Sequence, residues 1–339
     1  MTLSSLQTNI LRALRAMMLL GVVALAFGPA YLDIGQLRFF AQIYSLLVLV
    51  MMWNLLAGYA DIVTVGQHAF VGIGSYALYA FTAKTGFDVP TAIIAAGVLS
   101  FLIGIPITAV VFRMRAAYLA IGTWVVAEVC TLLASKIPGF GGATGITLPS
   151  SVIHAVGETV NERFANLYWM TLGLAVVCFV ATALLLRSRI GLGLMAMRDN
   201  EEAAGSVGVN LVLSRIVCFL WTALFLGLAG ALITLQNLRI QPRASFSLID
   251  YTVYVIFAVV IGGIGSIEGS IIGVVVYVGL RSYFSDYGNF YLIFLGAISI
   301  LIMLVEPRGI WGLVRRFLSE DVIPISHRYR KKTEASPAE

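Results

Sequence analysis

Long runs of apolar residues, separated by short polar segments, recur along the whole chain. A helix that crosses the hydrocarbon core of a bilayer needs about 20 mostly apolar residues, and many of these runs approach or reach that length. The pattern predicts about ten membrane segments, of which the third and the last three are short or glycine-rich and indicate tilted, broken or half-helices. Their ranges are 13–32, 38–58, 62–82, 90–112, 117–135, 168–186, 213–235, 250–265, 271–286 and 290–306.

The composition supports this interpretation. Hydrophobic residues make up 60% of the 339 positions and charged residues only 12%, whereas a soluble globular chain carries about 25% charged residues. The predicted fold is therefore an all-α, polytopic transmembrane bundle. We expect one membrane domain over residues 1–318 and a cytoplasmic, partly disordered tail over 319–339.

The positions of the basic residues predict the orientation in the membrane. Lys and Arg accumulate on the cytoplasmic side of membrane proteins. With both termini inside, the outer loops hold only Arg38, Lys84, Lys136, Arg163, Arg239 and Arg243. The cytoplasmic pieces then hold Arg12, Arg15, Arg113, Arg115, Arg187, Arg189, Arg198, Arg308, Arg315, Arg316, Arg328, Arg330, Lys331 and Lys332. This asymmetry favours an N-in, C-in topology.

A charged loop over about 187–212 is cytoplasmic in this topology. Asp199 is a good N-cap and Glu202 follows three residues later, which is the spacing of a capping box. Ala203 and Ala204 favour helix, and Gly208 is suited to end it in a left-handed turn. The loop therefore predicts a short surface helix of about two turns. That helix is either an ordinary connector or a docking element that passes a partner's motion to the flanking spans.

Two ionisable residues, His68 and Glu128, fall well inside predicted spans, where such groups are costly and usually face the bundle interior or a cavity. Three interpretations fit: contact with a substrate, a hydrogen bond that stabilises helix packing, and proton coupling, for which no further deep relay is present. Gly265, Gly269 and Gly273 recur at every fourth position, a spacing that lets helix backbones approach closely in lipid. They predict a tightly packed hairpin, with gating by that hairpin as the alternative.

Several segments together resemble a known family. Glu202-Ala203-Ala204, followed by Gly208 and Asn210, is similar to the EAA loop of ABC importer permeases. The phrases 197–201 and 207–210 resemble the M-type (LivM-like) permeases of branched-chain amino acid transporters. Segments 54–59, 65–76, 117–123, 141–145, 260–266 and 306–309 are similar to further family segments, so the resemblance covers roughly 40–318. The chain departs from the family pattern at Tyr59–Asp61 and at Phe140, which leaves the substrate open.

The resemblance implies a function and partners. It implies a multi-pass permease of the bacterial inner membrane that moves branched-chain or related hydrophobic amino acids inward. Its partners would be a second, H-type permease, two ABC ATPases that carry the ATP and Mg²⁺, and a periplasmic solute-binding protein. The implied ATPase-coupling residues are Arg198, Asp199, Glu201, Glu202, Ala203, Ala204, Gly208 and Asn210. Urea, amides or aromatic acids as substrates, a homodimer of permeases, and a secondary transporter stay open as alternatives.

A substrate pathway is expected near the short spans. Helix N-termini at 62–82 and near 136–147 are suited to bind the carboxylate of an amino acid, and Glu128 is suited to meet its ammonium group. The candidate pathway residues are His68, Thr123, Glu128, Gly142, Thr144 and Gly145.

Catalytic motifs are not found in the sequence. It contains no Gly-x-x-x-x-Gly-Lys-Ser/Thr phosphate loop, no catalytic triad and no metal-ligand cluster. We therefore expect no enzyme activity, no metal and no cofactor in this chain, and any ATPase must be a separate subunit.

Overall fold

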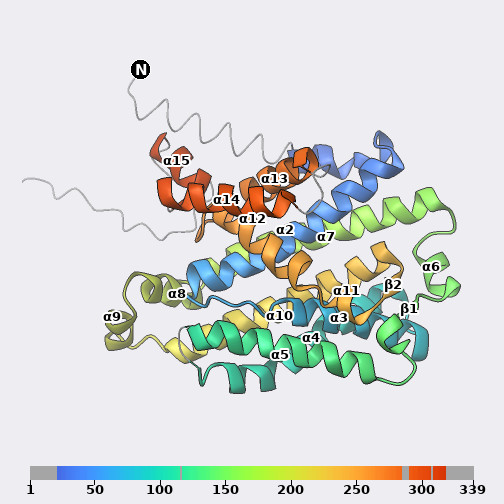
Figure 1. Cartoon of the computed structure of the whole chain (residues 1–339), viewed down its shortest axis with the longest axis horizontal. Coiled ribbons are helices and arrows are strands. Elements are labelled where there is room, and N and C mark those ends of the chain that lie inside the picture. The colour runs from blue at the N-terminus through green and yellow to red at the C-terminus, as the bar shows by residue number, and fades with distance from the viewer. Residues whose placement is uncertain (1–20, 115–116, 285–289, 307, 318–339) are drawn as a thin grey trace, which may run out of the picture.

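The computed structural model describes residues 21–114, 117–284, 290–306 and 308–317. Within them the protein is a bundle of helices with one two-stranded ribbon (Figure 1). The long helices are α2 (Ile34–Tyr59), α4 (Val89–Val111), α5 (Ala117–Lys136), α7 (Val160–Arg187), α10 (Leu211–Asn237), α13 (Ile267–Phe284) and α14 (Phe290–Val305). Shorter helices are η1 (Gly28–Ala30), α3 (His68–Tyr79), η2 (Ala80–Lys84), η3 (Gly142–Thr144), α6 (Ser150–Val156), α8 (Arg189–Asp199), α9 (Glu201–Ser206), α11 (Pro242–Ser245), η4 (Ile249–Val253), α12 (Tyr254–Gly262) and α15 (Gly309–Phe317).

Eight segments of the described chain are long and apolar enough to cross a membrane: Ile34–Tyr59, Val89–Val111, Tyr118–Lys136, Val160–Arg187, Leu211–Asn237, Pro242–Gly262, Ile267–Phe284 and Leu292–Arg316. The all-α, polytopic class is therefore confirmed. Residues 13–20 of the first expected span, together with Arg12 and Arg15, and the whole expected tail of 319–339 lie outside the described residues.

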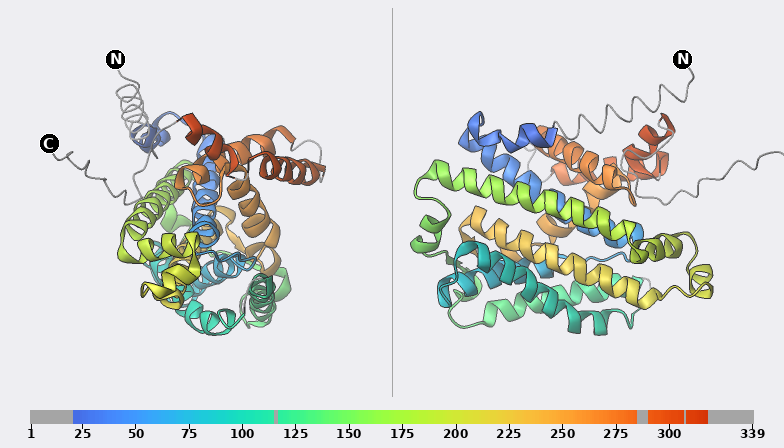
Figure 2. Two further views of the ribbon diagram at one scale, coloured as in Figure 1. Left: turned by 90° about the vertical axis from the view of Figure 1, so that its left-hand side faces the viewer. Right: turned by 180° about the vertical axis from the view of Figure 1, so that it is seen from behind.

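Helices α2 and α10 form the centre of the bundle. Both are buried along most of their length, and α10 packs against α4, α3 and α2, while α2 packs against α7 (Figure 2). The outer helices α4 and α5 bury only one side, so their other faces present long apolar side chains to the surroundings. Such a face is stable where lipid or another membrane helix covers it.

The expected span at 62–82 is shorter than predicted. Residues 61–67 are not helical, and the helix α3 that follows has only twelve residues, all of them buried. The non-helical segment is held by hydrogen bonds, because Trp53 Nε1 donates to the Thr64 carbonyl at 2.9 Å and Thr123 Oγ1 accepts from the Val65 N–H at 3.2 Å. These contacts satisfy backbone groups that a bilayer would leave unpaired.

The segment 136–167, which lies between the fifth and sixth expected spans, is largely structured. It contains η3, the strand β1 (Ile146–Thr147), α6 and the first turns of α7. The strand β1 pairs antiparallel with β2 (Arg239–Ile240), in the register Ile146 with Ile240 and Thr147 with Arg239. This ribbon ties the loop to the end of α10.

Close backbone contact joins α12 to α13 across a turn at Gly263, Ile264 and Gly265. A Cβ on Gly262 would lie 1.9 Å from the Gly269 carbonyl oxygen, and a Cβ on Gly273 would lie 2.0 Å from the Ala258 carbonyl oxygen. Gly263 and Gly265 both have positive φ, at 127° and 80°, a conformation that glycine adopts at little cost.

We predict that Gly273→Ala destabilises the protein, because the added methyl group would overlap the α12 backbone. Overpacking typically costs about 1–3 kcal/mol, so we expect a lower melting temperature for the detergent-solubilised protein. Gly279→Ala is the matched control on the same helix, since a Cβ there meets nothing within 4 Å. Equal melting temperatures for the two variants would refute the close contact.

Candidate functional site: the α8–α9 connector

The connector between α7 and α10 begins at a single shared residue. Ser188 ends α7 and also caps α8, because its Oγ donates to the Leu185 carbonyl at 2.6 Å and accepts from the Gly191 N–H at 3.4 Å. Its backbone is extended, with φ −76° and ψ 173°, so α8 leaves α7 at an angle without an intervening loop.

The N-cap of α9 is Asn200, one residue later than predicted. Asp199 is still the last helical residue of α8, whereas Asn200 is extended and its Oδ1 accepts from the Ala203 N–H at 2.9 Å. The predicted capping box of Asp199 and Glu202 is therefore wrong. Glu201 and Glu202 still occupy the first turn of α9, where carboxylates favour the positive end of the helix dipole.

The C-terminus of α9 is closed by a Schellman motif. The Val209 N–H donates to the Ala204 carbonyl and the Gly208 N–H donates to the Gly205 carbonyl, both at 3.1 Å. Gly208 has a φ of 88°, the left-handed conformation that this motif requires. The helix α9 thus has caps at both ends despite having only six residues.

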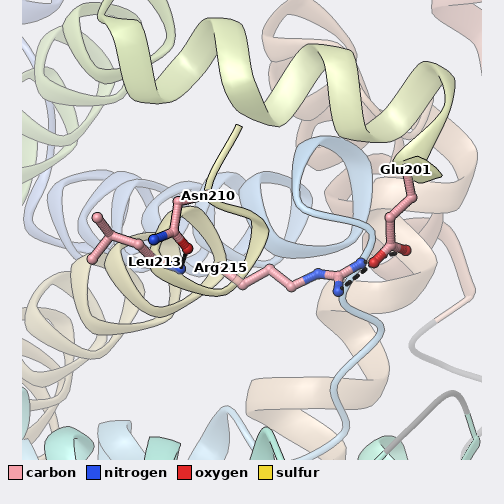
Figure 3. Close-up of polar contacts among 4 residues, drawn as sticks. All are labelled: Glu201, Asn210, Leu213 and Arg215. Atoms are coloured by element: carbon pink, nitrogen blue, oxygen red, sulfur yellow. Dashed lines mark hydrogen bonds and ion pairs between the residues drawn. The ribbon is translucent and has the colours of Figure 1, made fainter. Parts of the chain in front are cut away.

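An ion pair holds α9 on α10. Figure 3 shows the Arg215 guanidinium forming two parallel hydrogen bonds with the Glu201 carboxylate, each 2.9 Å long. Asn210 caps α10 through a 3.0 Å bond from the Leu213 N–H to its Oδ1. Bidentate pairs of this kind fix orientation as well as distance.

The outward surface of α9 is exposed and its inner surface is not. Ala204 is 2% exposed and packs inward, while Glu202, Ala203 and Ser206 face outward. Val207, just beyond the helix, is 80% exposed. A groove of about 480 Å³ lies beside this surface, between α8 and the segment 208–214.

Arg198, at the end of α8, connects the connector to the centre of the bundle. Its guanidinium lies 5.8 Å from the Tyr59 ring centroid at the end of α2 and forms a 3.7 Å ion pair with Asp199. A Cβ on Gly265 would come 3.3 Å from Arg198 Nη1. The connector therefore touches both α2 and the α12–α13 turn.

That turn is bonded directly to α2. Asn54 Oδ1 accepts from the Gly265 N–H at 2.7 Å. Its Nδ2 donates to the Ser266 carbonyl at 2.7 Å and to Ser270 Oγ at 2.9 Å. Arg198, the turn and α2 thus form a continuous set of contacts from the connector into the bundle.

The candidate pathway residues do not meet in one cavity. His68 is buried at the start of α3, and its Nδ1 shares a 3.1 Å hydrogen bond with Thr252 Oγ1. Thr123 is buried on α5, where its Oγ1 donates to the Ala120 carbonyl. The space around Thr123 measures only about 10 Å³, which leaves no room for a substrate. In this conformation both residues serve helix packing.

Gly142, Thr144 and Gly145 lie in the loop after α5. Gly142 and Gly145 have φ values of 56° and 77°, and Thr144 Oγ1 donates to the Gly141 carbonyl at 2.8 Å. Phe140 anchors this loop against Tyr79, with ring centroids 5.3 Å apart. The glycines allow a tight turn that seats the loop on α3 and β2.

Glu128 lies on the exposed face of α5. Its neighbours on that face are the apolar residues Trp124, Val125, Val129, Leu132 and Leu133. Within the described residues its carboxylate forms no hydrogen bond or ion pair. It is therefore directed away from the interior of this chain, contrary to the usual expectation for a charged residue inside a span.

The family model for the permease component of branched-chain amino acid transport systems matches residues 35–304. The chain belongs to this family. The permease is 27% identical over 325 residues to the high-affinity branched-chain amino acid permease protein LivM of Salmonella typhimurium, covering 88% of this chain and 75% of the relative. For LivM of Escherichia coli the identity is 27% over 288 residues, covering 77% and 66%. For the probable permease LivH of Methanocaldococcus jannaschii it is 28% over 181 residues, covering 46% and 56%.

No solved structure matches the permease. The family and its relatives establish a multi-pass permease with a role in transport, and the recognition made from the sequence is confirmed.

One feature of the permease has no counterpart among the sequence-based candidates. A cleft of about 660 Å³ is lined by residues of α2, α10, η4, α12 and α13, including Asp250, Tyr277 and Arg281. The lining residues are spread between Phe39 and Ser282 and match no motif. The sequence feature that could have indicated them is the position of Asp250 and Arg281 at the ends of two separate apolar runs.

We predict that Asn200→Ala loosens α9, whereas Asp199→Ala does not. Loss of an N-cap costs about 0.5–2 kcal/mol, and Asn200 supplies the cap bond to Ala203. Hydrogen exchange at the amides of residues 201–207 measures this directly, and faster exchange is expected only in the Asn200 variant. Equally fast amide exchange in the Asp199 and Asn200 variants would contradict the assignment of the N-cap to Asn200 alone.

Proposed function

We propose that the permease is the membrane subunit of an ABC importer that moves branched-chain or related hydrophobic amino acids into the cell. Separate ATPase subunits drive it by binding α9 and displacing it. The coupling surface comprises the exposed residues of α9 and its flanks: Arg198, Asp199, Glu201, Glu202, Ala203, Gly208 and Asn210, with Ala204 as the inward anchor.

The observation that carries this proposal is that α9 is exposed and yet firmly held. Its outer face is open to a partner, while Glu201 fixes it to α10 and Arg198 contacts α2 and the α12–α13 turn. An ordinary flexible connector would absorb an applied motion. A connector capped at both ends transmits that motion to the spans it joins.

The partners follow from what the chain lacks and from its relatives. The sequence has no phosphate loop, so ATP and Mg²⁺ belong to two partner ATPases. The likeness to both LivM and LivH supports assembly with a second, H-type permease. A periplasmic solute-binding protein completes the machine by delivering the amino acid at the end of the bundle that carries the β1–β2 ribbon.

The same proposal includes the topology. The excess of Lys and Arg in the connector and near the C-terminus supports N-in, C-in insertion in the inner membrane, with α9 in the cytoplasm. The β1–β2 ribbon, at the opposite end of the bundle from α9 (Figure 1), then faces outward.

Glu128 takes a role in this assembly. A carboxylate on a lipid-facing surface is costly, so we place the exposed face of α5 against the second permease. Glu128 then lines the pathway between the two subunits and meets the ammonium group of the passing amino acid.

Glu202→Lys is expected to abolish ATP-driven uptake in reconstituted vesicles, because it reverses a charge on the face that binds the ATPase. Deletion of 199–208 should have the same effect. Membrane insertion should stay intact for both, since α9 lies outside the spans. Nucleotide-dependent uptake of radiolabelled L-leucine, measured with the full set of subunits, checks this.

The matched control for the charge reversal is Glu158→Lys, an exposed residue in the loop between α6 and α7 at the other end of the bundle. It should leave the binding of the ATPase subunits to α9 unchanged, whereas Glu202→Lys should lose that binding. Unchanged uptake by the deletion variant would discard the coupling role of α9, and uptake without nucleotide or companion subunits would discard the whole proposal in favour of a secondary transporter.

Glu128→Gln should reduce the rate of leucine uptake about tenfold or more, because a charge-assisted hydrogen bond to the ammonium is lost. Glu162→Gln is the control, since glutamine also completes the capping box at the start of α7. Wild-type uptake by Glu128→Gln would remove Glu128 from the pathway.

A further inference from the structure

The cleft between α2, α10, η4, α12 and α13 lies at the opposite end of the bundle from α9. It is lined by the first half of α2, the last turn of α10 and the last turns of α13, whereas α9 lies near the end of α2 and the start of α10 (Figure 1). Its volume of about 660 Å³ is in the range of small-molecule sites.

Two opposite charges open into this cleft without pairing. Ser247 Oγ donates to Asp250 Oδ2 at 2.6 Å and accepts from the Asp250 N–H, which holds the carboxylate in place. The Arg281 guanidinium lies 5.4 Å from the Tyr254 ring centroid. Within the described residues neither charge forms an ion pair. The cleft therefore presents one anion and one cation to a ligand.

A buried hydroxyl beside Arg281 adds a second indication. Tyr277 is 0% exposed and lines the cleft, and its hydroxyl lies within reach of the Arg281 side chain one turn further along α13. Within the described residues this hydroxyl forms no hydrogen bond of ordinary length and angle. Buried polar groups normally have partners, because leaving one unpaired costs free energy. This group points to a polar ligand atom next to Arg281.

The remaining wall of the cleft is aliphatic and is formed by Ile43, Leu46, Leu49, Ile233 and Val278. Gln236 closes it, with Nε2 donating to Ser45 Oγ at 2.9 Å. A ligand with two opposite charges close together and a branched aliphatic group fits this arrangement, since each part meets its chemical complement.

We propose that this cleft is a binding site for a zwitterionic α-amino acid with an aliphatic side chain. Its carboxylate binds Arg281 and the Tyr277 hydroxyl, its ammonium group binds Asp250, and its side chain packs against Leu46 and Ile233. The site rests on the proposed transport of amino acids. It gives the permease a selectivity step of its own, within one subunit, in addition to the specificity of a solute-binding protein.

The test is equilibrium binding of tritiated L-leucine to the intact transporter complex in lipid nanodiscs, without the solute-binding protein. Competitors are 4-methylpentanoate, which lacks the ammonium group, and 3-methylbutylamine, which lacks the carboxylate. Each analogue forfeits one charged contact, so each should compete at least about tenfold more weakly than leucine.

Each variant that removes a charge from the cleft should lose affinity for leucine and the preference for leucine over the analogue that lacks the matching charged group. Asp250→Asn is expected to weaken leucine binding about tenfold or more and to remove the preference for leucine over 4-methylpentanoate. Arg281→Gln should remove the preference over 3-methylbutylamine, and Tyr277→Phe should weaken leucine and 4-methylpentanoate alike. A merely structural role would not produce these complementary changes. Asp88→Asn and Arg38→Gln, exposed charges outside the cleft lining, should bind leucine normally.

Three results would each refute the proposed binding site. The first is no saturable leucine binding to the wild-type complex, and the second is unchanged leucine affinity in both Asp250→Asn and Arg281→Gln. The third is competition by phosphoethanolamine equal to that of leucine, which would assign the cleft to a lipid headgroup.

Nucleotide-driven uptake, measured in parallel with the solute-binding protein present, separates the proposed binding site from the proposed function. Normal uptake without leucine binding in the cleft refutes the site alone, whereas absence of nucleotide-driven uptake refutes the proposed function.

Discussion

Close approach of helix backbones is the constraint on which this bundle depends. Apolar side chains gain nothing from leaving lipid for other apolar side chains, so packing at short range must hold membrane helices together. Here α3 and α10 meet through glycines: a Cβ on Gly74 would lie 2.0 Å from the Gly227 carbonyl oxygen, and one on Gly230 would lie 2.0 Å from the Val71 carbonyl oxygen. Because α10 is the centre of the bundle, these contacts also set where α4, α2 and the connector lie.

Polar bonds then join elements that the glycines have brought together. Asn54 bonds α2 to the α12–α13 turn and to the start of α13 through three contacts, and Arg198 lies against α2 and the turn. A partner at α9 would therefore act on a rigid junction of helices and not on isolated segments. The cleft with Asp250 and Arg281 lies at the other end of the same helices, α2, α10 and α13, so the two regions share structural elements over the full length of the bundle.

The sequence predicted the spans well where one apolar run makes one helix, as for α2, α4 and α10. It failed where tertiary contacts replace helical bonds, as at 61–67, because the Trp53 and Thr123 bonds that hold that segment come from other helices. The cap of α9 was placed one residue early, since Asp199 and Asn200 are both good caps and only the backbone of α8 decides between them. The cleft was not predicted, because hydropathy alone gives no information on which residues of α2, α10 and the α12–α13 hairpin face each other.

The shared cap at Ser188 has a mechanical consequence. Where a flexible loop joins two helices, its rotatable backbone bonds absorb a displacement of one helix, so the other helix does not move with it. In this protein only one non-helical residue, Ser188, separates α7 from α8. Under the proposed coupling, a tilt of α8 would be passed to α7, whose twenty-eight residues extend from the connector to the far end of the bundle.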